Sequence, residues 1–242
     1  MSRNQNSNTM ETIVKTLLFF HISSGFISLV LFWLPVFLKK GGKGHRNTGK
    51  AYVFFMWIMV ASAALLSIKN VIIGNYFMAS FLGFIALITA NPLWYGIAVL
   101  NREKRQSNGF RIGRIVFDSL IVCSGALLLG FGIYLQSIGN GSAVLMIIFG
   151  GLGLTDLPAL IKKLKPTPPE FDPIRDHMVG LLTSGIAAYS AFFVFGAYTW
   201  IEQYLPGMWG VLPWVAPGVI GGVGITLGVK HFRKKGMIKA QD

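Results

Sequence analysis

Seven long apolar stretches constrain this chain more than any other feature of its sequence. They cover residues 13–38, 51–73, 76–100, 115–138, 143–161, 177–201 and 211–229. A helix needs about 20 apolar residues to cross a bilayer, and its backbone groups must be satisfied within the segment. None of the stretches has the period-two alternation of a barrel strand. The sequence therefore predicts an all-α integral membrane protein with a bundle of seven transmembrane helices.

Composition excludes the common alternatives to a membrane protein. Charged residues make up 13% of the 242 residues and hydrophobic residues 53%, whereas a soluble domain carries about 25% charged residues. Disorder requires low hydrophobicity and is excluded on the same ground. The single cysteine, Cys123, excludes an internal disulfide and a cysteine-rich metal or iron–sulfur site.

The basic residues fall in alternate loops. The connections after the first, third and fifth stretches and the C-terminal tail contain Lys39, Lys40, Lys43, Arg46, Lys50, Arg102, Lys104, Arg105, Arg111, Arg114, Lys162, Lys163, Lys165, Arg175, Lys230, Arg233, Lys234, Lys235 and Lys239. The connections after the second, fourth and sixth stretches contain no Lys or Arg. Because positive loops remain in the cytoplasm during insertion, this alternation predicts a bacterial inner-membrane protein with its N-terminus outside and its C-terminus in the cytoplasm.

This topology also accounts for the net charge of +13. The predicted partners of the basic loops are anionic lipid headgroups, and Arg46 and Arg111 are candidates for binding a headgroup or another anion. Nucleic acid is excluded as a partner because readout needs a groove-fitting or stacking surface. Three regions are expected: a polar N-terminal tail (1–12), a transmembrane domain (13–229) and a basic cytoplasmic tail (230–242).

Four ionisable residues on the predicted cytoplasmic side are the candidates for a functional site. They are His45, Asp118, Asp156 and His177. Two imidazoles and two carboxylates suit a zinc, iron or manganese site, in which His45, His177 and Asp156 would be the ligands. The carboxylates Asp118 and Asp156 also suit acid–base catalysis. Haem bound by His45 and His177 is a further possibility.

Several polar residues have a structural explanation beside the functional one. Asp118 follows Arg114 by four residues and could form a local ion pair, and Asp176 is a natural helix cap. Asn91 and Pro92 are expected to break the third stretch. His21, in the outer half of the first stretch, could be a ligand, a proton-handling group or a neutral histidine hydrogen-bonded to a neighbouring helix.

The glycines of the fifth and seventh stretches are expected to let helices approach closely. They are Gly150, Gly151 and Gly153, and Gly218, Gly221, Gly222 and Gly224.

Two segments carry a resemblance to a known family. Residues 40–53 read KGGKGHRNTGKAYV and lead into the second stretch, and residues 177–188 read HMVGLLTSGIAA. They resemble a family of bacterial multi-pass membrane proteins known as a domain of unknown function, with a Lys-Gly…His-Arg…Gly loop and a later helix that starts with His-Met. The resemblance implies no activity, and it directs attention to His45, Arg46, Gly49 and His177.

The preferred functional interpretation is a membrane enzyme or redox protein with a site in the cytoplasmic leaflet that binds a metal or haem. The alternative is a non-catalytic transporter, sensor or subunit of a membrane complex, in which the same residues tie helices together. Helix spacing alone does not decide between them, because Asp118, Asp156 and His177 lie on three different stretches and His45 precedes the second stretch.

Overall fold

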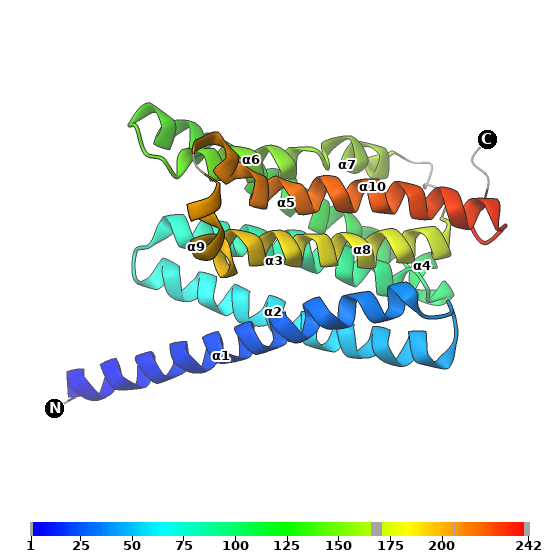
Figure 1. Cartoon of the computed structure of the whole chain (residues 1–242), viewed down its shortest axis with the longest axis horizontal. Helices are drawn as coiled ribbons and strands as arrows, with labels where there is room; N and C mark the ends of the chain where they lie inside the picture. Colours follow the sequence, from blue (N-terminus) through cyan, green and yellow to red (C-terminus); the bar gives the residue numbers. More distant parts are fainter. Residues whose placement is uncertain (1, 166–170, 206, 240–242) are drawn as a thin grey trace. The chain divides into compact units, whose positions relative to one another are not determined.

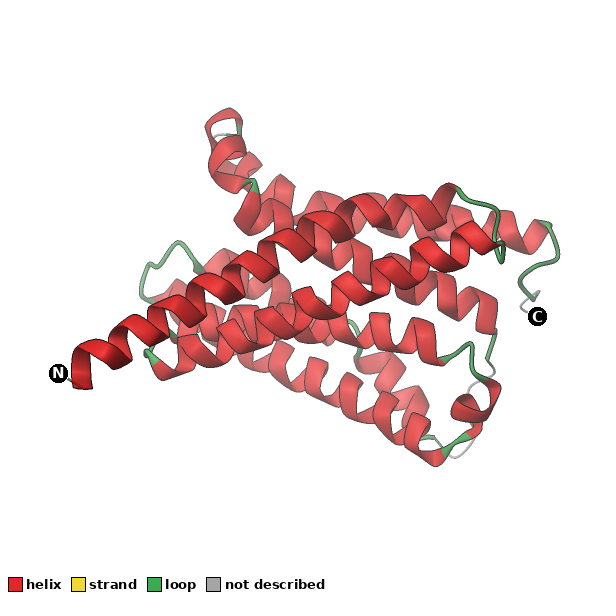
Figure 2. Cartoon of the chain, turned by 90° about the horizontal axis from the view of Figure 1, so that it is seen from below, coloured by secondary structure: helices red, strands yellow, loops and turns green. Residues whose placement is uncertain are grey.

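A computed structural model of the chain describes residues 2–165, 171–205 and 207–239. Its elements are α1 (Ser2–Phe37), α2 (Lys43–Ile72), α3 (Tyr76–Ala98), α4 (Arg102–Gln106), α5 (Asn108–Ser137), α6 (Ala143–Leu154), α7 (Leu157–Leu164), α8 (Pro173–Ala191), the π-helix η1 (Phe192–Gly196), α9 (Tyr198–Ile201), the short 3₁₀ helices η2 (Glu202–Tyr204) and η3 (Gly207–Val211), and α10 (Leu212–Lys234). Over these ranges the chain is helical, with short loops and no strand (Figure 2).

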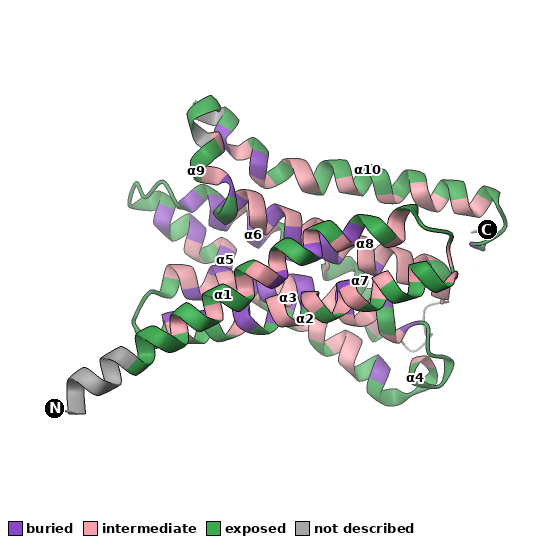
Figure 3. Cartoon of the chain, turned by 60° about the horizontal axis from the view of Figure 1, so that its bottom comes forward, coloured by how far each residue is buried: buried purple, intermediate pink, exposed green. Residues whose placement is uncertain are grey.

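Seven spans in the described part of the chain are long and apolar enough to cross a membrane. Large apolar side chains are exposed along them, among them Val30, Leu127 and Ile220. Figure 3 shows the same exposure along α10, whose single buried residue is Pro213. Apolar surface of this extent requires lipid or another apolar partner. The chain is therefore a multi-pass membrane protein, and the predicted all-α fold class with seven transmembrane helices is confirmed.

The helices extend beyond the apolar stretches at several ends. The predicted polar tail is helical from Ser2, and the basic segment around His45 belongs to the first turns of α2 rather than to a loop. Likewise α5 begins at Asn108, where the Ser107 hydroxyl accepts a hydrogen bond from the amide of Phe110. Hydropathy finds the lipid-facing part of a helix, whereas polar turns continue it into the headgroup region. Residue 1 and residues 240–242 of the two predicted tails lie outside the described residues.

The predicted interruption of the third stretch is absent, and the fifth is interrupted. The helix α3 continues through Pro92 to Ala98, so the predicted break at Asn91 and Pro92 is wrong. The fifth span, by contrast, is divided at Thr155 and Asp156 into α6 and α7.

The chain forms two compact units, Met1–Ala86 and Leu87–Asp242, and α3 passes from one to the other. In the first unit α1 and α2 lie side by side (Figure 1). Ser24 and Ser28 are buried on the face of α1 that contains His21, as the spacing predicts. The hydroxyl of Ser67 in α2 donates to the carbonyl of Ala79 at 2.7 Å and ties α2 to the start of α3.

In the second unit, helices pack in pairs through close backbone contacts. α5 lies against α6 and α8 against α10 (Figure 1), while α3 meets α8 where Gly96 faces Gly180. A Cβ added at Gly180 would lie 2.8 Å from the Cα of Gly96. α7 also packs against α5, and α3, α5, α7 and α8 carry the polar residues described next.

Candidate functional site

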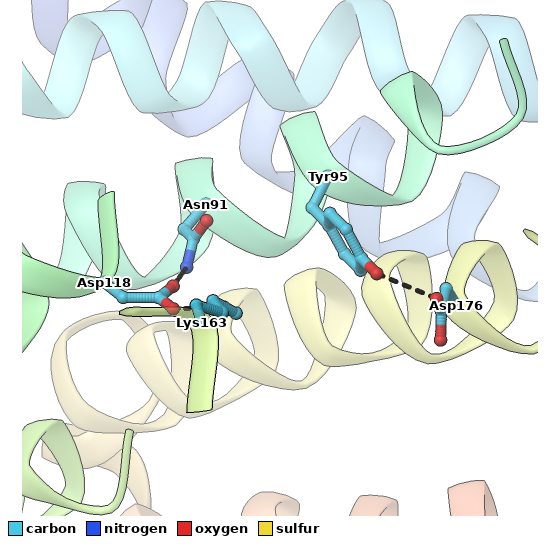
Figure 4. A network of polar contacts seen from close by, with 5 residues as sticks. All are labelled: Asn91, Tyr95, Asp118, Lys163 and Asp176. Atoms are coloured by element: carbon cyan, nitrogen blue, oxygen red, sulfur yellow. Dashed lines mark hydrogen bonds and ion pairs between the residues drawn. The ribbon is translucent and has the colours of Figure 1, made fainter. Parts of the chain in front are cut away.

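The polar centre of the second unit is Asp118, which is 2% exposed. Its two carboxylate oxygens have different partners, as Figure 4 shows. The amide nitrogen of Asn91 in α3 donates to Oδ1 at 3.2 Å, and the ammonium of Lys163 in α7 forms an ion pair with Oδ2. Three helices therefore meet at one buried carboxylate inside the apolar span Asn108–Ser137.

A second carboxylate, Asp156, lies within electrostatic range of Asp118 and Lys163. It occupies the junction between α6 and α7 and is half-buried. The residues Asn91, Asp118, Asp156 and Lys163 are called the Asp118 cluster below. The cluster brings together both carboxylates that the sequence singled out, and it has one ammonium for two carboxylates.

The local ion pair predicted between Asp118 and Arg114 is wrong. Asp118 pairs with Lys163, 45 residues away, while the guanidinium of Arg114 lies over the ring of Tyr95 at 4.7 Å and over that of Phe171 at 5.0 Å. Aromatic faces attract a guanidinium, so Arg114 has an alternative to pairing with Asp118 on the same helix.

Sequence reasoning missed Lys163 as a site residue. The sequence contains one signal for it: Lys163 follows Asp156 by seven residues, or two helical turns, so the two side chains lie on one face of a helix.

A second polar contact lies one helical turn along α3. The hydroxyl of Tyr95 donates to the carboxylate of Asp176 in α8 at 2.8 Å (Figure 4). The prediction that Asp176 caps this helix is wrong. The cap is Asp172, whose side chain accepts from the amide of Arg175 at 3.0 Å and from that of Lys239 at 2.8 Å. Proline at the first position of α8 shifts the helix start upstream of Asp176.

The two histidines predicted on the cytoplasmic side bind backbone carbonyls. Nδ1 of His177 donates to the carbonyl oxygen of Gly96 at 2.6 Å, and Nδ1 of His45 donates to that of Pro35 at 3.0 Å. Such a bond also orients histidines that ligate metals. However, the two belong to different units, and in the part of the chain that the structure describes, no three His, Cys, Asp or Glu side chains gather as a metal-binding group.

The His45 contact belongs to a C-terminal cap of α1. The ammonium of Lys40 donates to the carbonyls of Pro35 at 2.8 Å and Val36 at 2.6 Å, groups that a helix end leaves without an intrahelical partner. Burial lowers the pKa of the Lys40 ammonium from its ordinary value. The basic segment thus stabilises the turn between α1 and α2. The two predicted anion-binding residues, Arg46 and Arg111, are exposed.

His21 ties α1 to α2. Its Nδ1 lies 3.2 Å from the carbonyl oxygen of Met59 and 3.1 Å from the hydroxyl of Ser62. The interpretation of His21 as a histidine hydrogen-bonded to a neighbouring helix is confirmed.

We expect His21→Ala to lower the free energy of unfolding by about 1–2 kcal/mol, since it removes a hydrogen bond between membrane helices and some packing. Ile22→Ala, at an exposed neighbouring position, is the matched control and should cost less. The measurement is unfolding by denaturing detergent in mixed micelles. A cost equal to that of the control would contradict a tying role.

Comparisons with protein-family models, with curated proteins and with solved structures found no match to this chain.

Proposed function

We propose that this membrane protein is a transporter that uses a proton or another small monovalent cation, and that Asp118 binds this cation. The observation that supports the proposal is the buried carboxylate of Asp118 inside an apolar span, held by Lys163 and Asn91 from two other helices. Ionisable residues within a membrane are costly and mark ion and proton pathways.

The charge balance of the cluster suits reversible cation binding. The ammonium of Lys163 pairs with Asp118, and Asp156 lies within electrostatic range of both. The ionised cluster of two carboxylates and one ammonium therefore has an excess of one negative charge. In a low-dielectric environment that excess negative charge attracts a proton or monovalent cation, which can bind Asp118 when the ammonium is displaced. The second oxygen of Asp118 is held by Asn91, so the carboxylate keeps its orientation while its ionic partner changes.

The test uses proteoliposomes that contain a pH-sensitive dye and carry an imposed pH gradient. The purified protein should dissipate the gradient faster than empty vesicles, either with protons alone or on addition of Na⁺ or K⁺. Asp118→Asn should reduce the rate at least about tenfold, equivalent to about 1.4 kcal/mol in a barrier. Glu103→Gln, which removes an exposed carboxylate in α4, is the control. Equal rates for wild type and Asp118→Asn, or for wild type and empty vesicles, would contradict cation binding at Asp118. The cluster would then be an ion pair that ties helices together in a subunit of a membrane complex.

The enzyme or redox interpretation has less support from the arrangement of side chains. Its ligand set, His45, His177 and Asp156, is not gathered within the residues that the structure describes. Stoichiometric metal in the purified protein, or the strong visible absorption of haem, would restore this interpretation and its ligands.

The orientation and location that we propose are those of a bacterial inner-membrane protein with its N-terminus outside. In the second unit the basic α4, the end of α7 and the end of α10 lie at one end, where Lys239 reaches the start of α8. The exposed aromatic residues Trp200, Tyr204 and Trp209 lie in the connection between α8 and α10, and such residues favour a membrane interface. Anionic headgroups are the proposed partners of Arg46 and Arg111.

A reporter fused after Asp242 tests this orientation. A reporter that works only in the cytoplasm should be active there, since seven crossings place the two termini on opposite sides. Activity of a periplasm-dependent reporter at the same position would overturn the orientation.

A further inference from the structure

The span that contains Asp156 is a broken helix. Residues Ala143–Leu164 form one apolar span by composition, yet α6 ends at Leu154 and α7 begins at Leu157. Pro158, in the first turn of α7, has no amide hydrogen to continue the ladder of α6. Thr155 and Asp156 keep right-handed helical angles, but their amides bond to carbonyls three residues back instead of four. The hydrogen-bond ladder is therefore weakened at this turn, and interrupted helices recur at ion sites in transporters.

The two halves of this span are attached to α5 in different ways. α6 meets α5 through backbone: a Cβ at Gly125 would lie 2.9 Å from the Cα of Gly153, and one at Gly150 would lie 2.5 Å from the amide nitrogen of Leu129. α7 has a single buried residue, Leu160, and the ion pair of Lys163 with Asp118. The glycine contacts hold α6 closely against α5, whereas α7 packs less extensively against α5 and adds one buried side chain and one ion pair.

We propose that α7 is a hinged arm that carries Lys163 onto and off Asp118 and so controls access to the cation site. The hinge is the junction at Thr155 and Asp156. This inference rests on the proposed function of Asp118. With Lys163 in place, its ammonium occupies the position that a cation would take. When the arm swings away, a proton or monovalent cation replaces the ammonium at the carboxylate, and the charge at Asp118 stays balanced.

The Lys163 ammonium has a second favourable environment once α7 moves away from Asp118. Lys163 lies between Lys162 and Lys165 near the end of α7, and Lys162 and Lys165 are exposed. A lysine stem can extend so that its ammonium reaches lipid phosphates while its methylenes stay in apolar surroundings. The outer face of α7, with Leu157, Ile161 and Leu164 exposed, suits lipid in either position.

Spin-label distances between α5 and α7 test the arm. Labels are attached to Ile112→Cys and Leu164→Cys, both exposed positions, in a Cys123→Ser background that removes the exposed native thiol. The parent should give one short distance. Lys163→Gln should add a population longer by about 5 Å or more, the rise of one helical turn. Lys162→Gln, an exposed lysine on the same arm, should leave the distribution unchanged.

Asp118→Asn is the second variant, because it releases the arm without altering α7. It should reproduce the longer population, and gel filtration identifies any variant that fails to fold. Unchanged distances in both folded variants would overturn the arm, whatever the proteoliposomes show. If the distances lengthen but gradient dissipation does not depend on Asp118, the arm is supported and the cation site is rejected. The failure of the arm and the failure of the proposed function are therefore distinguishable.

Discussion

Asp118→Ala should lower the free energy of unfolding by about 3–5 kcal/mol, the cost of removing one partner of a buried ion pair. The reason is the position of Lys163, whose side chain is 17% exposed and which loses its carboxylate. The amide of Asn91 loses its acceptor at the same time, which adds the cost of an unsatisfied polar group. Unfolding by denaturing detergent in mixed micelles provides the measurement.

A double variant separates the contribution of the Asp118–Lys163 ion pair from the cost of leaving one buried charge without its partner. Asp118→Leu combined with Lys163→Met replaces both charges by apolar groups, and such replacements are often neutral or stabilising. We therefore expect the double variant to be more stable than Asp118→Ala and to recover most of the lost free energy. If the effects of the single Asp118→Leu and Lys163→Met changes simply added, the two side chains would not be interacting as the structure places them. The same double variant should be inactive in the gradient assay, which separates stability from transport.

The sequence was sufficient for the fold class because lipid imposes a simple rule. A span of about 20 apolar residues must be helical in a bilayer, and the seven stretches satisfy it without tertiary information. The helix ends were less predictable, because the polar first turns of α2 and α5 have no hydropathy signal. His45 and Arg111 were therefore assigned to loops, although both lie on helices.

The candidate site was predictable in part. Asp118 and Asp156 are predictable because a membrane penalises carboxylates, and the structure gathers them. Lys163 looks in the sequence like any other interfacial cation, since its partner is 45 residues distant and helix spacing reveals only local partners such as Arg114. His45 and His177 share only a predicted side of the membrane, and each binds a carbonyl within its own unit.

Glycine spacing likewise predicts that helices pack closely, but it does not predict which glycines make the contact. Gly150 and Gly153 meet α5, and Gly221 meets Ile186 of α8, as predicted. A Cβ at Gly151 would have no atom within 4 Å, and the same is true at Gly218, Gly222 and Gly224. A row of small residues does not identify the face that contacts a neighbouring helix when adjacent positions are all glycine.

Gly150→Ala and Gly151→Ala should therefore differ sharply in stability although they are neighbours in one helix. A Cβ at Gly150 would lie 2.5 Å from the amide nitrogen of Leu129 and 2.8 Å from the carbonyl oxygen of Gly125. These are backbone atoms and cannot rotate away, so α6 and α5 must separate. Forced overpacking typically costs about 1–3 kcal/mol, and here it also weakens the glycine contacts that hold α6 in place.

Gly151→Ala is the matched control, because the new methyl group meets open space in the same helix. In water, replacing a helical glycine by alanine gains about 0.5–1 kcal/mol from backbone entropy, so this variant should be neutral or slightly more stable. Unfolding of both variants in mixed micelles gives the comparison directly. Equal stabilities would mean that α5 and α6 do not touch at Gly150. A loss at Gly150 alone would confirm that this contact holds α6 against α5, which the proposed hinge between α6 and α7 requires.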